Sequence, residues 1–130
     1  MATRLLIVDD VADLRSMLAT VFTTDERFEV VGQAGDGIEA VAETERLQPD
    51  VVLLDLAMPR LDGIRAIPRL HSVRPGLKIV VLSGFDHPHM ERAALAACAM
   101  AFIYKGAPTE EILDLVDDVA RRPPKQACTA

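Results

Sequence analysis

Five polar side chains stand directly after apolar runs of this sequence, where buried strands would end. They are Asp9, Asp10, Asp55, Ser83 and Lys105. Three carboxylates in one crevice repel one another unless a cation lies between them, and Mg²⁺ prefers such oxygen ligands. An ammonium group and a hydroxyl group can each hold a phosphate oxygen. If the fold brings these residues together, the set predicts magnesium-dependent phosphoryl chemistry.

Asp55 is the expected acceptor of the phosphoryl group. It follows Val51–Leu54 directly, so its carboxylate would lie at the end of a strand that is buried on both faces. A carboxylate oxygen can act as a nucleophile and form a covalent intermediate. Lys105 would pair with one oxygen of the phosphoryl group, and the Ser83 hydroxyl would donate to another.

The acidic residues are also expected to hold the magnesium ion. Asp10 and Asp55 are the predicted direct ligands, and Asp9 would act mainly through water. The backbone carbonyl of Ala57, two residues beyond Asp55, could complete the ligand set. This division agrees with the habit of Mg²⁺ to take one or two carboxylates and to keep its other positions for water and phosphate.

Five apolar runs alternate with five amphipathic segments along the chain. The runs predict strands at Leu5–Val8, Phe28–Ala34, Val51–Leu54, Lys78–Leu82 and Ala101–Tyr104. Such alternation is typical of an α/β fold, in which helices cover both faces of a parallel sheet. With right-handed crossovers we expect the flavodoxin-like strand order 2-1-3-4-5. The carboxyl ends of the strands would then bring the five polar residues to one edge of the sheet.

Each helical segment is expected to bury one apolar stripe. The stripe of the first segment consists of Leu14, Met17, Leu18, Val21 and Phe22, and that of the second consists of Ile38, Val41 and Ala42. Pro68 lies inside the third segment, where it removes one backbone donor. We therefore expect a kink at Pro68, or a helix that begins later than the apolar spacing suggests.

Composition and charge limit the class of protein. A chain of 130 residues, half of them apolar, has the size of one domain. The net charge of −6 argues against direct binding of nucleic acid. No apolar stretch approaches the roughly 20 residues that cross a membrane. Cys98 and Cys128 have no ligand-like spacing and fit a reducing compartment, so the expected location is the cytoplasm, without a membrane partner.

Taken together, these motifs resemble the receiver domain of bacterial two-component response regulators, over essentially residues 4–121. The matching residues are Asp9-Asp10, Leu53-Leu54-Asp55-Leu56, Met58-Pro59, Asp62-Gly63, Ser83-Gly84 and Lys105. The segment Val30-Val31-Gly32, with Ala34 and Asp36-Gly37, is most similar to receivers of the LuxR/NarL type. On this basis residues 1–121 are assigned to a CheY-like receiver domain, and residues 122–130 to a linker or disordered tail.

The resemblance implies that a histidine kinase transfers a phosphoryl group to Asp55. The face made by the fourth helix, the fifth strand and the fifth helix would then shift and engage a partner, an effector domain or a second receiver as a homodimer. In the family the residue at the Ser83 position moves toward the phosphate, and an aromatic three residues before the lysine turns inward. That aromatic is Phe102 here, which can pack but cannot hydrogen-bond as the common tyrosine does.

Two other residues depart from the family pattern. Gly106 follows Lys105 where many receivers have proline, which again resembles the LuxR type. Cys98 stands at a helix end where the family often has glycine, and a positive φ there would cost about 1 kcal/mol.

Three interpretations of the output stay open. The domain could belong to a transcription regulator whose DNA-binding domain is absent from this chain, which the ending Arg121-Arg122-Pro123-Pro124 favours. It could also be a stand-alone receiver that acts through protein contacts. The third is a phosphatase of the haloacid-dehalogenase type, which needs a second acid two residues after its nucleophile. Those positions hold Ala57 and Val11, so we expect a phosphoacceptor domain and not a turnover enzyme.

The residues two positions beyond Asp55 and Ser83 predict a long-lived phosphate. In the family these positions, here Ala57 and Phe85, control water access. Phe85 would shield the acyl phosphate, and Ala57 offers no group that could orient an attacking water. Loss of radioactive label from the purified phosphoprotein measures the lifetime, and a half-life of seconds would contradict the prediction.

Overall fold

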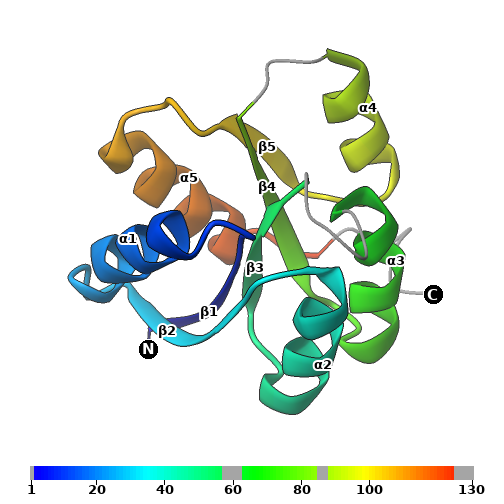
Figure 1. The fold of residues 1–130 in the computed structure, drawn as a ribbon, viewed down its shortest axis with the longest axis horizontal. Helices are drawn as coiled ribbons and strands as arrows, with labels where there is room; N and C mark the ends of the chain where they lie inside the picture. Colours follow the sequence, from blue (N-terminus) through cyan, green and yellow to red (C-terminus); the bar gives the residue numbers. More distant parts are fainter. Residues whose placement is uncertain (1, 57–62, 85–87, 125–130) are drawn as a thin grey trace.

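Five parallel strands form a single sheet in the order β2-β1-β3-β4-β5, flanked by five helices (Figure 1). The computed structural model describes residues 2–56, 63–84 and 88–124, without the side chains of residues 88–90. The strands are β1 (Thr3–Val8), β2 (Phe28–Ala34), β3 (Val51–Asp55), β4 (Lys78–Ser83) and β5 (Ala101–Tyr104). The helices are α1 (Ala12–Thr23), α2 (Gly37–Leu47), α3 (Gly63–Val73), α4 (Pro88–Ala96) and α5 (Thr109–Arg121). The expected α/β class and strand order are confirmed.

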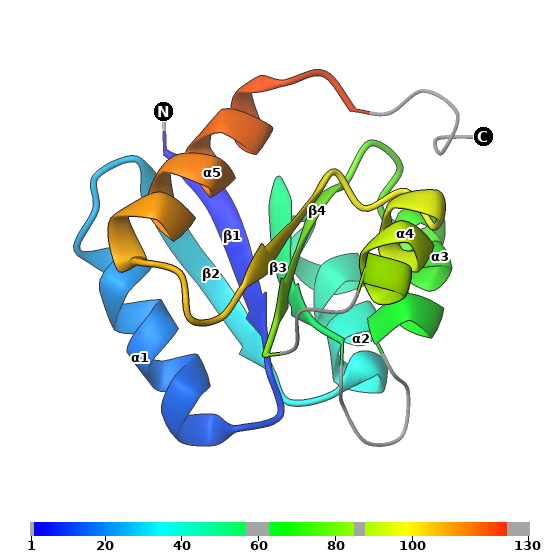
Figure 2. The same ribbon diagram turned by 90° about the horizontal axis from the view of Figure 1, so that it is seen from above.

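The helices cover both faces of the sheet, and the core is accordingly divided into two clusters. Figure 2 shows α1 and α5 on one side and α2, α3 and α4 on the other. Along β1 the side chains alternate between the two sides, since Leu6 and Val8 pack with α2–α4 while Leu5 and Ile7 pack with α1 and α5. Both faces of β1 and β3 are therefore buried, which explains their unbroken apolar runs.

Two of the predicted helix stripes are partly wrong. Met17 is 53% exposed and Ile38 is 48% exposed, although both were assigned to buried faces. The buried residues of α2 are the small side chains Gly37, Ala40 and Thr44, so the helix is rotated relative to the stripe that Ile38 suggested. The spacing of apolar residues alone does not identify a buried face made of small residues.

The helix α3 begins at Gly63 and continues through Pro68. The alternative of a later start is therefore wrong, while a kink at Pro68 stays a prediction. No helix among the described residues is long and apolar enough to cross a membrane.

Helix α4 ends in a Schellman motif with Cys98 in the left-handed conformation. The φ angle of Cys98 is 83°, its N–H donates to the Leu95 carbonyl, and the Ala99 N–H donates to the Ala94 carbonyl. The positive φ that the sequence suggested is thus present. The expectation of a reduced thiol is wrong, because Cys98 is disulfide-bonded. The other cysteine, Cys128, lies outside the described residues, and the cysteines no longer support a reducing compartment.

The Thr44 hydroxyl offers a test of core packing in α2. Thr44 is fully buried, and its oxygen has no hydrogen-bond partner in the part of the chain that the structure describes. Thr44→Val keeps the shape and removes the unsatisfied group, so we expect the free energy of unfolding to rise by about 1 kcal/mol. Urea denaturation measures the change. The control is Thr20→Val at an exposed site of α1, which should shift stability by no more than about 0.5 kcal/mol.

Candidate functional site

The structure brings the predicted charged residues together at the carboxyl edge of the sheet. Asp9, Asp10 and Asp55 each offer a carboxylate oxygen, and these oxygens lie within 4.8 Å of one another. The Lys105 Nζ lies 2.9 Å from the Asp9 Oδ2 and 3.4 Å from the Asp55 Oδ1. Residues separated by 96 positions of sequence thus form one compact cluster.

The register of the strands explains why these residues meet. The ends of β1 and β3 are level, because Val8 pairs with Leu54, and the next residues are Asp9 and Asp55. Asp55 in turn pairs with Leu82 of β4. At the far side, the Lys105 N–H donates to the Ser83 carbonyl at 2.7 Å and extends the pairing of β4 with β5. A shift of one residue in any of these pairs would point a site residue to the other face of the sheet.

Asp9 is held by two interactions, one for each carboxylate oxygen. Its Oδ1 accepts the Val11 N–H at 2.9 Å, while its Oδ2 pairs with Lys105. Asp9 is almost fully buried, whereas Asp10 is exposed. Asp10 and Asp55 stay the expected direct ligands of a cation.

Arg15 is a site neighbour that the sequence interpretation missed. Its Nη1 donates to the backbone carbonyl of Asp9 at 2.6 Å, and its Nε donates to the Gln33 Oε1 at 3.3 Å. Arg15 therefore ties the loop after β1 to the end of β2. A charged residue between Leu14 and Met17 was the available signal, but its partner lies in a different segment of the chain.

The charges of the cluster depend on one another. Burial disfavours the charged form of Lys105, but its contacts with Asp9 and Asp55 outweigh that effect and raise its pKa. Lys105 is therefore a permanent cation at neutral pH. Three carboxylates and one ammonium still leave negative charge in excess, and carboxylate oxygens suit a hard divalent cation. The residues present fit a magnesium site on these grounds.

Some of the remaining predicted site residues lie in the part of the chain that the structure describes, and others lie outside it. Ser83 is buried at the end of β4, beside the cluster. Phe102 is half-buried and packs against the core cluster on the side of α2–α4. Ala57 and Phe85 lie outside the described residues, as do Met58, Pro59 and Asp62, so their expected roles stay predictions.

Gly63 links the start of α3 to the backbone beyond Asp55. Its N–H donates to the Leu56 carbonyl at 2.8 Å. A Cβ at this position would lie 2.7 Å from the Leu56 Cα and would also collide with the Asp55 carbonyl oxygen. The glycine is therefore required for close approach, and it holds the exit of β3 in place.

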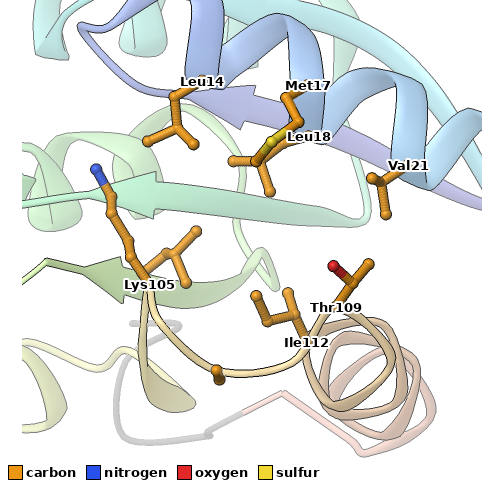
Figure 3. A pocket seen from close by; sticks show the side chains of 9 residues that line it. Leu14, Met17, Leu18, Val21, Lys105, Thr109 and Ile112 are labelled. Carbon is orange, nitrogen blue, oxygen red and sulfur yellow. The ribbon is translucent and has the colours of Figure 1, made fainter.

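An apolar groove adjoins the cluster between α1 and α5 (Figure 3). Lys105 lines one end of the groove, and the exposed Met17 and the half-buried Val21 lie along it. On the opposite side it is lined by Ala107, Thr109 and Ile112. The groove thus lies between α1 and α5, with a residue of the charged cluster at one end.

The chain is similar to known proteins in sequence and in fold. Residues 5–117 match the family model described as the response regulator receiver domain. The chemotaxis protein CheY of Thermotoga maritima is 36% identical over 121 residues, which cover 93% of this chain and 100% of that protein. The signal receiver domain of the response regulator NarL from Mycobacterium tuberculosis has a TM-score of 0.87 at 30% identity, covering 92% of this chain and 97% of that chain. A CheX–CheY–BeF₃–Mg²⁺ complex from Borrelia burgdorferi gives a TM-score of 0.85 at 28% identity, with coverage of 92% and 90%.

The acidic cluster predicts how stability responds to magnesium. Asp10→Asn removes one of three neighbouring charges, so it should stabilise the metal-free protein and abolish most of its response to Mg²⁺. At a magnesium concentration about tenfold above Kd, the wild type should gain about 1.4 kcal/mol. Thermal unfolding with and without Mg²⁺ measures both effects. Asp13→Asn, an exposed acid in the first turn of α1, is the control and should respond like the wild type; an unchanged response in Asp10→Asn would refute the assignment.

Proposed function

The chain belongs to the response regulator receiver domain family, and we propose that Asp55 is the residue at which it accepts a phosphoryl group. A receiver domain is a phosphoacceptor switch of a two-component system. One observation carries the assignment to Asp55. Its buried carboxylate lies 3.4 Å from the Lys105 ammonium and within 4.8 Å of the oxygens of Asp9 and Asp10. Asp55 is the last residue of the central strand β3, and its carboxylate contacts the lysine.

The proposed step is an in-line displacement on phosphorus. An Asp55 carboxylate oxygen forms a bond to the phosphorus atom while the bond from phosphorus to the donor nitrogen breaks. The electron pair of the broken bond returns to the imidazole of the donor histidine. Lys105 would balance the charge on one phosphoryl oxygen, and Ser83 would donate its hydroxyl to another.

Magnesium is the proposed cofactor, held by Asp10 and Asp55 with Asp9 acting through water. When bound, Mg²⁺ neutralises the charge of phosphoryl oxygens. Asp9 is fixed by Val11 and Lys105, so its carboxylate stays close to the proposed ligands Asp10 and Asp55. The backbone carbonyl of Ala57 stays the proposed third ligand.

The proposed phosphodonor is a histidine kinase. Asp55 is only 5% exposed, so the donor imidazole must reach a nearly covered carboxylate while its carrier rests on the surrounding surface. The groove between α1 and α5 supports such an approach, because it begins at Lys105 and offers the exposed apolar side chain of Met17 (Figure 3). The proposed location of this domain is the cytoplasm.

For the output we propose a receiver of the LuxR/NarL type that controls transcription through an effector domain. The resemblance to the NarL receiver supports this proposal. Residues 1–121 would form the receiver, ending with α5, and residues 122–130 would form a linker or tail. The face of α4, β5 and α5 would engage the effector domain or a second phosphorylated copy. The full-length resemblance to CheY supports the alternative of a stand-alone receiver that acts through protein contacts.

Direct binding of nucleic acid by this domain is not part of the proposal. The exposed surface of α5 carries Glu110, Glu111, Asp114 and Asp118. Such a surface repels a phosphate backbone. The family match also leaves the haloacid-dehalogenase alternative without support, so the domain is proposed to promote only its own phosphorylation and dephosphorylation.

Labelling by acetyl phosphate tests the role of Asp55. With Mg²⁺ present, the wild type should incorporate one phosphoryl group, and Asp55→Asn should lose nearly all labelling because its amide is not a nucleophile. Phosphate content is measured by intact-protein mass spectrometry. Asp13→Asn is the matched control and should label like the wild type. Equal labelling of wild type and Asp55→Asn would refute the assignment.

A further inference from the structure

The aromatic ring of Tyr104 lies across the turn that follows β5. A Cβ built on Gly106 would lie 2.9 Å from the Tyr104 Cδ2 and 3.0 Å from its Cζ, and would collide with Cε2. The ring therefore covers the place where any larger residue would put its side chain. Tyr104 is nevertheless 52% exposed, so part of the side chain contacts the turn while the rest remains accessible.

This turn carries Lys105 into the charged cluster. The Ala107 N–H donates to the Tyr104 carbonyl at 3.0 Å, which closes a four-residue turn with Lys105 and Gly106 at its centre. The Lys105 N–H is bonded to the Ser83 carbonyl, and its Nζ reaches Asp9 and Asp55. The position of the ammonium group thus depends on the shape of this turn.

Glycine at the centre of the turn gives the backbone unusual freedom. Two hydrogen bonds anchor the ends of the turn, while Gly106 itself has no side chain with which to pack. The ring of Tyr104, one residue before Lys105, occupies the space that a side chain at Gly106 would fill. Since the φ angle of Gly106 is not in the left-handed region, the ring and not the backbone conformation accounts for the glycine.

We propose that Tyr104 is a positioning residue for phosphoryl transfer, whose ring, packed on Gly106, holds the turn that places the Lys105 ammonium beside Asp55. The proposal rests on the proposed function of Asp55 for its catalytic consequence. The structural part of the proposal, which concerns only the ring and the turn, is independent of the function of Asp55. The hydroxyl of Tyr104 has no part in this role.

Three single variants and one double variant separate the ring from other causes. Tyr104→Phe keeps the ring, Tyr104→Ala removes it, and Gly106→Ala forces it off the turn. Tyr104→Ala should lower the rate of labelling by acetyl phosphate about tenfold, a loss within the range caused by slight misplacement of a catalytic group. Tyr104→Phe should keep the wild-type rate. Gly106→Ala should slow the wild type several-fold but should add little to Tyr104→Ala, because the ring it displaces is already gone.

Amide hydrogen exchange gives a second readout that does not involve phosphate. Tyr104→Ala and Gly106→Ala should speed exchange of the Ala107 and Lys105 amides, and Tyr104→Phe should not. Thermal unfolding of each variant shows whether the whole fold has weakened. Chemical shifts of the core amides should match the wild type.

The outcomes distinguish the two proposals. If the wild type and Asp55→Asn label equally, the function proposed for Asp55 fails, and unchanged amide exchange in Tyr104→Ala would still refute the ring contact. If Asp55 behaves as expected, a wild-type labelling rate in Tyr104→Ala overturns the positioning role, even where its melting temperature falls. A rate loss in Tyr104→Phe equal to that in Tyr104→Ala would assign the effect to the hydroxyl and overturn the proposal as well. Additive losses in the double variant would show that Gly106 acts independently of the ring.

Discussion

The contact of the Lys105 ammonium with Asp9 and Asp55 is the interaction on which the site depends. Both carboxylates are almost fully buried, and buried charges are strongly destabilising when they have no partner. The lysine comes from the end of β5, two strands away from β3 in the sheet. The charge balance of the site therefore requires the complete order β1-β3-β4-β5. Changing the neighbours of any of these strands would leave two buried acids without their cation.

Each strand end needs local contacts to keep its side chain at this edge. The loop after β1 is held by the Asp9 carboxylate on Val11 and by Arg15 on the Asp9 carbonyl. The exit of β3 is held by Gly63, whose backbone lies against Leu56. Each of these contacts satisfies a backbone group of a loop, which leaves the loop fewer alternative conformations. The acidic half of the site is consequently fixed from two directions.

Much of this organisation could be predicted from the sequence, because buried parallel strands appear as unbroken apolar runs and polar residues at their ends must converge. The boundaries of β2 and β5 and the cluster of Asp9, Asp10, Asp55 and Lys105 follow from that pattern alone. The exposure of Ile38 could not be predicted, because α2 buries small residues that a search for large apolar side chains overlooks. The disulfide bond of Cys98 was likewise missed, because the sequence around Cys98 carries no signal of pairing. Contacts such as Arg15 with Gln33 or Tyr104 with Gly106 depend on side-chain directions that sequence spacing does not determine.

The two halves of the site are held in different ways, and this difference bears on how a signal could leave it. Asp9 is fixed by a hydrogen bond to the backbone inside the fold. Lys105 belongs to a short turn, and the half-exposed ring of Tyr104 packs on that turn. A phosphoryl group on Asp55 would draw the Lys105 ammonium toward new oxygens, and this movement would act on the turn that carries Lys105. If the Tyr104 ring influences the position of the Lys105 ammonium, then the position of the ammonium must influence the ring by the same free energy, because coupling is reciprocal. Tyr104 would then couple the charge state of Asp55 to the surface at the end of β5. This coupling does not involve residue 102, where Phe102 lacks the hydroxyl group of the tyrosine common in the family.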